Sequence, residues 1–333
     1  MKAVVMTRPG GPEVLEPREL EEPHIGSSTQ IKVRLRAAGI NPIDTKLRSR
    51  GLLFPDALPA VLGCDGAGEV VEVGAGVTRL RPGDRVWFCN GGLGREQGNY
   101  AEYTLVEEVA AQPMPASVNF AQAAAAPLVL LTAWEALFDR ARLAAGQSVL
   151  VHAGAGGVGH VAIQLARHAG ARVCTTVSTD AKAAFVRDLG ADEVIRYRDQ
   201  DLVEAVEAWT GGRGVDLALD TVGPDVFRRT MPAVAHYGDL VTLLDPGPEM
   251  EWKDARARNL RIGFELMLTP MVEDLPEARA HQGEILRSCG DLMESGELRV
   301  EVGRTFPLQE AAAAHRLLEE GHNQGKLVLT VGD

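Results

Sequence analysis

The stretch that decides the fold is His152-Ala153-Gly154-Ala155-Gly156-Gly157-Val158-Gly159, which lies between an apolar run and an amphipathic one. Gly154, Gly156 and Gly159 have the spacing G-x-G-x-x-G. In a turn that joins a strand to a helix, the first glycine permits the tight bend, the second lets the backbone approach a pyrophosphate, and the third lets the helix pack closely on the strand. The N–H groups and the dipole at the start of such a helix attract phosphates.

The segments around this turn supply the context that the motif requires. Taken alone, the three glycines would equally fit a flexible surface turn. The residues before them, 148–153, have the composition of a buried strand, and a helix is expected at about 157–169. Beyond it the expected elements alternate, with strands at 172–177, 193–196, 215–220, 239–244 and 262–266 and helices at 180–189, 202–209 and 225–235. Alternation of this kind predicts a parallel sheet with right-handed crossovers, and therefore a dinucleotide-binding α/β domain.

The residues after the second expected strand indicate which dinucleotide binds. Proteins that bind NAD normally carry Asp or Glu here to hold the ribose 2′-hydroxyl. In this chain the position holds Ser178, with Lys182 one helical turn later, and Asp180 is interpreted as the N-cap or a first-turn acid of the next helix. Lys182 alone would fit an ordinary exposed helix lysine. Together with Ser178 and Tyr197, it favours NADPH over NADH.

The first 120 or so residues differ from this region, because short β-rich segments alternate there with glycine and proline. Alanine-rich helices are expected at 120–131 and 132–142, and the chain returns to strand at 326–331. We expect the C-terminal segment to rejoin the first domain, so that the cofactor domain is an insertion. The expected boundaries are 1–122 for the first part of a catalytic domain, 123–268 for the dinucleotide-binding domain and 269–333 for the return to the catalytic domain.

Composition narrows the partners and the compartment. The 333 residues include 46 acidic and 34 basic side chains, which give a net charge of −12. Nucleic acids and anionic membranes attract clustered cationic charge, so neither is an expected partner. No apolar stretch approaches the ~20 residues that a membrane span needs, and the N-terminal apolar run is too short for a signal peptide. Four widely spaced cysteines give no disulfide framework, and the cytoplasm is the expected compartment.

Further motifs extend over nearly the whole chain. They are Ala38-Gly39-Ile40-Asn41-Pro42-Ile43-Asp44, Gly63-Cys64-Asp65-Gly66-Ala67-Gly68, Val71-Glu72-Val73-Gly74, Pro82-Gly83-Asp84-Arg85-Val86, Leu189-Gly190-Ala191 and Gly325-Lys326. With the glycine-rich turn, they resemble the quinone oxidoreductase/zeta-crystallin branch of the medium-chain dehydrogenases. The resemblance implies a GroES-like β-barrel catalytic domain, an inserted Rossmann domain with a doubly wound parallel sheet, and NADPH as cofactor. It also implies a homodimer joined through edge strands of the Rossmann domain, for which residues 239–244 and 259–266 are the candidates.

The resemblance also implies roles for single residues. Gly156, Gly157 and Val158 would meet the pyrophosphate, and Asn41 and Thr132 would lie near the nicotinamide. The full set of expected cofactor-binding residues is Asn41, Thr132, Gly154, Gly156, Gly157, Val158, Gly159, Ser178, Lys182, Tyr197, Leu243 and Lys326.

Metal binding is not expected. Zinc-dependent members of this superfamily carry a cysteine in the first barrel motif and a Gly-His-Glu run; this chain has Asn41 at the first place and Gly63-Cys64-Asp65 at the second. A catalytic zinc needs about three converging ligands and an open position. Cys64 and Asp65 supply two candidates at most, and the eight histidines are dispersed without ligand spacing.

Without zinc, oxidation of an alcohol lacks its Lewis acid, whereas a hydride can pass directly to a conjugated acceptor. The sequence therefore predicts an NADPH-dependent, metal-free reductase of a small-molecule quinone or of an activated C=C bond in an enone or enal. Asn41, Asp44 and Lys46 are the expected catalytic residues. Asn41 before proline would equally open a turn, and Asp44 would equally cap a helix. Some relatives carry tyrosine at the position of Lys46, which leaves the acceptor open.

Two other interpretations remain at this point. One is an enzyme of the zinc alcohol dehydrogenase type, which the missing ligands disfavour. The other is a non-catalytic NADPH-binding protein, as the lens crystallins of this family illustrate, because the cofactor turn would survive the loss of turnover.

Overall fold

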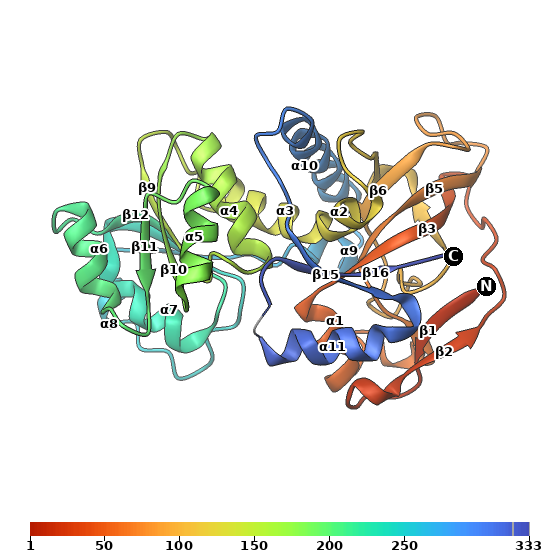
Figure 1. Cartoon of the computed structure of the whole chain (residues 1–333), viewed down its shortest axis with the longest axis horizontal. Coiled ribbons are helices and arrows are strands. Elements are labelled where there is room, and N and C mark those ends of the chain that lie inside the picture. The colour runs from red at the N-terminus through yellow and green to blue at the C-terminus, as the bar shows by residue number, and fades with distance from the viewer. Residues whose placement is uncertain (322, 333) are drawn as a thin grey trace. The chain divides into compact units, whose positions relative to one another are not determined.

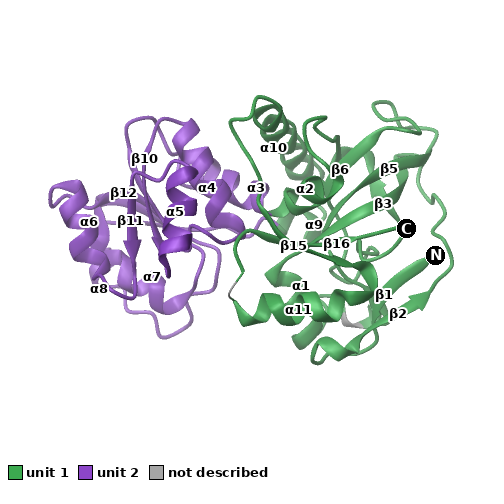
Figure 2. Cartoon of the chain, in the orientation of Figure 1, with its two compact units in different colours: residues 1–128, 268–333 green, residues 129–267 purple. Residues whose placement is uncertain are grey.

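The computed structural model describes residues 1–321 and 323–332 and divides the chain into two compact units (Figure 2). The first unit combines residues 1–128 with 268–333, and the second is the continuous segment 129–267. The boundary expected between residues 122 and 123 falls within α2 (Phe120–Ala125), whereas the compact units part further along, after Leu128.

The second unit is built on a six-stranded sheet in the order β11-β10-β9-β12-β13-β14, and all of its pairings are parallel. Its strands are β9 (Ser148–Val151), β10 (Arg172–Val177), β11 (Glu193–Arg196), β12 (Val215–Asp220), β13 (Val234–Thr242) and β14 (Arg261–Phe264). The chain therefore leaves the central strand β9 in one direction and returns to its other side with β12, which is the strand order of a dinucleotide-binding sheet. The predicted doubly wound parallel sheet is confirmed.

Helices lie on both faces of this sheet (Figure 1). They are α4 (Gly157–His168), α5 (Asp180–Asp188), α6 (Leu202–Thr210), α7 (Pro224–Thr230) and α8 (Lys253–Ala257). Between the face of the sheet and these helices, Leu150, Phe227 and Leu240 are fully buried in one apolar cluster. Burial of such side chains contributes roughly 1.5–3 kcal/mol each relative to exposure, which fixes the sheet under its helices.

The first unit contains two sheets. A three-stranded sheet has the order β2-β1-β4, with β1 (Lys2–Met6), β2 (Leu15–Glu19) and β4 (Ala60–Val61). A seven-stranded sheet has the order β15-β16-β3-β5-β6-β8, and its remaining strand, β7, pairs with β3. Its strands are β3 (Gln30–Ile40), β5 (Asp65–Val73), β6 (Arg85–Cys89), β7 (Tyr103–Glu107), β8 (Ala111–Pro113), β15 (Val302–Pro307) and β16 (Lys326–Thr330). The antiparallel pair β16–β3 sets Leu327 opposite Ile40, so the end of the chain completes the sheet begun near its start.

The helices of the first unit are α1 (Pro42–Arg50), α2, α9 (Thr269–Val272), α10 (Pro276–Glu294) and α11 (Ala311–Glu320), while α3 (Pro127–Trp134) leads into the second unit. Helices α1 and α11 are joined by an ion pair in which the buried Arg48 guanidinium lies 2.6 Å from Glu319. In the part of the chain that the model describes, no helix is both long enough and apolar enough to cross a membrane.

Prolines explain where the local predictions were wrong. The helix expected at 225–235 ends at Thr230, because Pro232 cannot donate a helical hydrogen bond and lies in a 3₁₀ turn, Met231–Ala233. As a result β13 begins at Val234, five residues before the expected strand. The long helix expected at 120–131 is likewise divided in two at Pro127, and the one expected at 132–142 is the end of α3 followed by a π-helix, Glu135–Arg140.

Candidate functional site

The glycine-rich turn joins β9 to α4 at the centre of the parallel sheet. Gly156 is the N-cap of α4. A Cβ atom at Gly154 would collide with the Thr175 hydroxyl of the neighbouring strand, and one at Gly159 would collide with the Ala153 carbonyl oxygen. Both positions therefore require glycine, and the first N–H groups of α4 remain free of helical acceptors, as at any helix start. This arrangement suits the binding of a pyrophosphate.

The side chain of His152, the residue before the turn, is buried and lies between two threonine hydroxyls. Its Nδ1 lies 3.2 Å from the Thr176 hydroxyl and its Nε2 lies 2.8 Å from the Thr230 hydroxyl. Because the Thr230 hydroxyl donates to the Val226 carbonyl at 2.6 Å, it accepts from the Nε2–H of His152. Thr176 also accepts the N–H of Ala153 at 3.0 Å. Burial lowers the pKa of His152 to about 4, in keeping with a neutral ring.

The residues predicted to meet the 2′-phosphate gather at the ends of β10 and β11. The register sets Val177 opposite Arg196, which brings Ser178 and Tyr197 to the same edge of the sheet. Ser178 and Lys182 are half-buried, and Tyr197 is exposed. Among the described residues Lys182 has no ion-pair partner.

Arg196 was missed by the sequence analysis. Its guanidinium lies 2.7 Å from Asp180 and 3.0 Å from Asp199, so both acids near this edge are paired with a cation. Asp180 occupies the first turn of α5, whose N-cap is Thr179. The signal for Arg196 was its place at the end of a strand, directly before Tyr197.

Two other predicted cofactor residues lie elsewhere in the second unit. Thr132 is buried in α3. Leu243 follows β13, and its N–H donates to the Asp220 carbonyl at 3.1 Å. Asp220, at the end of β12, was not among the predicted cofactor-binding residues. Its carboxylate accepts from the N–H groups of Val222 and Gly223, and burial raises its pKa.

In the first unit, the predicted catalytic residues Asn41, Asp44 and Lys46 lie at the start of α1. Pro42 occupies the first helical position, and the N–H of Asn41 donates to Asp44 Oδ2 at 2.8 Å, which caps the helix. The Tyr100 hydroxyl donates to the same oxygen at 3.0 Å. Asn41 and Asp44 are fully buried, and burial raises the pKa of Asp44 to about 7.

Lys46 differs from Asn41 and Asp44 because it is only half-buried. Among the described residues its ammonium has no hydrogen-bond or ion-pair partner. Burial lowers its pKa, and the nearby Arg50 lowers it further. Lys46 is therefore the one predicted catalytic side chain of the three whose polar group is not already engaged within the protein.

The pairing of β16 with β3 brings Lys326 to the start of α1. Its ammonium donates to the Ile40 carbonyl at 3.0 Å and to Asn41 Oδ1, and lies 3.7 Å from Asp65 Oδ2. The Asn41 amide in turn donates to Asp65 Oδ2 at 2.9 Å. Lys326, predicted to bind the cofactor, is thus engaged by three groups of its own unit.

Comparisons with known proteins agree with this geometry. The model of an alcohol dehydrogenase GroES-like domain matches residues 27–116, and that of a zinc-binding dehydrogenase matches residues 189–329. Quinone oxidoreductase 1 of Escherichia coli is 34% identical over 325 residues, which cover 96% of each chain. The chain belongs to the quinone oxidoreductase family of the medium-chain dehydrogenases. The predicted family and the predicted class of enzyme, an oxidoreductase, are confirmed.

Other members of the family bear on its chemistry. A 2-haloacrylate reductase of a Burkholderia species is 34% identical over 341 residues, which cover 98% of each chain. The crystal structure of the Escherichia coli quinone oxidoreductase complexed with NADPH superposes with a TM-score of 0.88 at 32% identity, over 99% of this chain and 100% of that one.

For this quinone oxidoreductase family member, the residues do not fit the zinc that one family model's description implies. In residues 1–321 and 323–332, no three His, Cys, Asp or Glu side chains converge in a group that suits a metal ion. Cys64 and Asp65 are both fully buried, and the ammonium of Lys326 lies beside Asp65.

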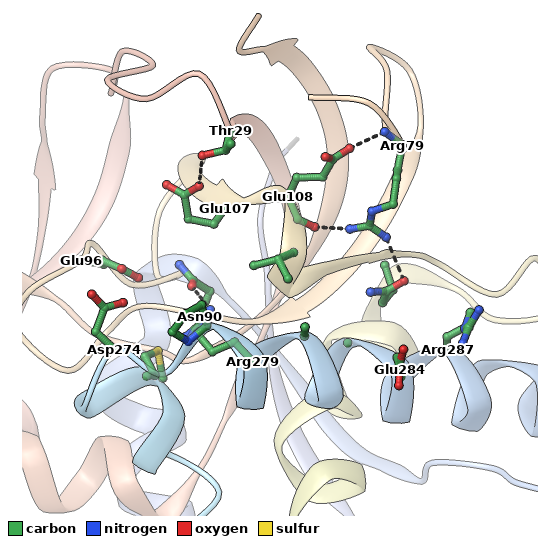
Figure 3. Close-up of a pocket in the computed structure, with 16 residues that line it drawn as sticks. Thr29, Arg79, Asn90, Glu96, Glu107, Glu108, Asp274, Arg279, Glu284 and Arg287 are labelled. Atoms are coloured by element: carbon green, nitrogen blue, oxygen red, sulfur yellow. Dashed lines mark hydrogen bonds between the residues drawn. The ribbon is translucent and has the colours of Figure 1, made fainter. Parts of the chain in front are cut away.

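A surface hollow of about 610 Å³ lies in the first unit, beside α10 (Figure 3). Arg279 donates to Asn90 Oδ1 on its wall. On the opposite side the Arg79 guanidinium donates to the Glu108 carbonyl and more weakly to Gln112. The lining carries charges of both signs, and none of the predicted site residues belongs to it in the described part of the chain.

The buried His152 makes the stability of the second unit pH-dependent. Its pKa in the folded state, about 4, lies below the ordinary value of 6.5, so between these limits the unfolded chain binds a proton that the folded chain does not. The free energy of unfolding therefore falls as the pH decreases from 6.5 to about 4, by up to about 1.4 kcal/mol per pH unit from this residue. We expect the His152→Asn variant to show a shallower decrease in urea unfolding over this range. The exposed His236→Asn variant is the control, and equal slopes in all three proteins would contradict the prediction.

Proposed function

We propose that the protein is an NADPH-dependent reductase that transfers a hydride to a quinone or to an activated C=C bond. We further propose that the reaction needs no metal ion and that the protein acts in the cytoplasm. The single observation that carries the proposal is the pairing of a glycine-rich turn at the centre of the parallel sheet with a cationic edge at Lys182. The names of the relatives, quinone oxidoreductase and 2-haloacrylate reductase, support the two classes of acceptor. Four free, buried cysteines support a reducing compartment.

The second unit fits NADPH. Gly154 and Gly159 let the turn and α4 pack against Thr175 and the Ala153 carbonyl, where a Cβ atom would collide, and the start of α4 offers N–H groups to the pyrophosphate. At the ends of β10 and β11, Ser178, Lys182 and Tyr197 would meet the 2′-phosphate. No unpaired acid opposes that phosphate there, because Asp180 is held by Arg196.

Residues of α1 would stabilise the acceptor while it is reduced. When bound, NADPH supplies the hydride, and the oxygen of the conjugated acceptor gains negative charge as the hydride adds. Lys46 would stabilise this oxygen and transfer a proton to it, then regain a proton from water. Asn41 and Asp44 would fix the first turn of α1, which directly precedes Lys46, and the half-burial of Lys46 strengthens its electrostatic effect.

The test of this function is the oxidation of NADPH with a panel of quinones, enones, enals and enoyl thioesters. We expect the Lys46→Met variant to lower kcat by about 100-fold on the acceptors that the wild type reduces, because one oxyanion donor is lost. Activity of the wild type should fall as the pH rises through the Lys46 pKa, which lies below the ordinary 10.5.

The Lys46→Arg variant should keep its charge to higher pH and move this alkaline limb upward. Lys2→Met, at an exposed lysine of the same unit, serves as the control. The proposal fails if no acceptor is reduced while NADPH still binds, and the role of Lys46 fails if the Met variant keeps full kcat.

Cofactor choice is tested at Lys182. We expect Lys182→Ala to raise KM for NADPH by about ten- to a hundredfold, the effect of losing one charge-assisted hydrogen bond, with little change in KM for NADH. The matched control is Lys253→Ala, an exposed lysine of the same unit. An equal rise for both cofactors would show that Lys182 does not contact the 2′-phosphate.

We also propose a homodimer joined through β14. This strand lies at the end of the sheet order, and within the described residues it pairs with β13 alone. Phe264 and Leu266 at this edge are 57% and 60% exposed, an apolar surface that a second copy would cover. Phe264→Glu is expected to give a monomer in sedimentation velocity, whereas Leu275→Glu in the first unit leaves the dimer intact. A monomeric wild type would contradict the proposal.

A further inference from the structure

The Lys326 ammonium lies among oxygen atoms in the interior of the first unit. Lys326 is 3% exposed, and its Nζ contacts the Ile40 carbonyl, Asn41 Oδ1 and Asp65 Oδ2. The other Asp65 oxygen accepts the N–H of Leu128 at 2.8 Å. Every oxygen of the cluster therefore has a donor, and within the described residues Lys326 is the only side chain that forms an ion pair with Asp65.

This cluster contains the positions at which the zinc-dependent members of the superfamily carry metal ligands. Here those positions hold Asn41 and Cys64, with Asp65 next to them. Zinc prefers thiolate and imidazole ligands, whereas the polar groups that converge on Lys326 are an amide oxygen, a peptide oxygen and a single carboxylate. A positive charge is already present at their centre, and a divalent ion placed there would meet both its repulsion and its volume.

We infer that the Lys326 ammonium is the built-in cation of the catalytic unit: it replaces a metal ion as the counter-charge of Asp65 and positions Asn41 at the start of α1. The positioning follows from the hydrogen bonds. With Oδ1 held by Lys326 and Nδ2 held by Asp65, the side-chain amide of Asn41 has one orientation.

The orientation of Asn41 extends to the rest of the helix start. The Asn41 N–H is bound by Asp44, whose carboxylate is also held by Tyr100, so the first turn of α1 is fixed on two sides. Lys46 extends from the next residues of this helix. Lys326 is thus a positioning residue, 285 positions away in sequence from the side chain that it orients.

The inference rests on the proposed function only for its kinetic readout. The first arm of the test needs no turnover: the purified wild type is dialysed against Zn²⁺ and against a chelator, and its metal content is measured. We expect no stoichiometric zinc, and equal thermal stability in both buffers. One equivalent of zinc that is lost in the Asp65→Asn variant would overturn the inference.

The second arm separates charge balance from positioning. Lys326→Met leaves Asp65 buried without a cation and is expected to lower Tm strongly, because breaking one side of a buried pair leaves an uncompensated charge. The double variant Lys326→Met/Asp65→Asn removes both charges and should recover much of the lost Tm. A single variant as stable as the wild type would overturn the role of counter-charge, and the double variant keeps the test usable if the single one does not fold.

Kinetics of the double variant then test the positioning. Because Asn41 still lacks its donor, kcat should stay about 100-fold below the wild type, with KM for NADPH nearly unchanged. Lys326→Arg, which keeps a charged donor, should recover part of kcat. Recovery of kcat together with Tm in the double variant would show that Lys326 only balances charge. If the wild type reduces no acceptor, the proposed function fails, while the metal and Tm measurements still decide the built-in cation.

Discussion

The antiparallel pairing of β16 with β3 is the contact on which the first unit depends. Leu327 lies opposite Ile40, and the residue before it places an ammonium between the end of β3 and the start of β5. Without this pairing, the buried carboxylate of Asp65 would have no cation, and the Asn41 amide would lack one of its two partners. The start of α1, which carries the proposed catalytic residues, therefore depends on a strand from the far end of the sequence.

Electrostatics in this protein are local. The net charge of −12 describes the whole chain, yet the groups proposed to bind the anionic cofactor are the start of α4 and the single cation of Lys182 at one sheet edge. The acids at that edge are held by Arg196. In the first unit, burial raises the pKa of Asp44 and lowers that of Lys326. The charge state of each therefore depends on its buried partner, Tyr100 for Asp44 and Asp65 for Lys326, more than the charge state of a surface group depends on its neighbours.

The sequence predicts features that depend on neighbouring residues, and it does not predict contacts between residues far apart in the chain. The glycine-rich turn and the strands at 193–196 and 215–220 are decided by local pattern, and they lie where the pattern puts them. The helix expected at 225–235 is shorter in the structure because Pro232 interrupts an otherwise helical pattern. The contacts of Lys326 and Tyr100 with the start of α1 join residues far apart in the chain, and no local pattern encodes them. Arg196 was missed for a related reason, since only the register of β10 and β11 shows that it reaches Asp180.

The insertion of the second unit has a consequence for the order in which the chain assembles. Residues 129–267 are continuous, so this unit has all of its strands as soon as they leave the ribosome. The first unit does not, because residues 37–40 of β3 lack a neighbour on one side until β16, almost 300 residues later, has been synthesised, whereas β7 covers residues 30–34 of β3 earlier. During translation the nascent protein therefore contains a complete second unit while the sheet of the first unit is still incomplete. The unpaired edge at residues 37–40 of β3 is then the segment at which we expect a chaperone to bind.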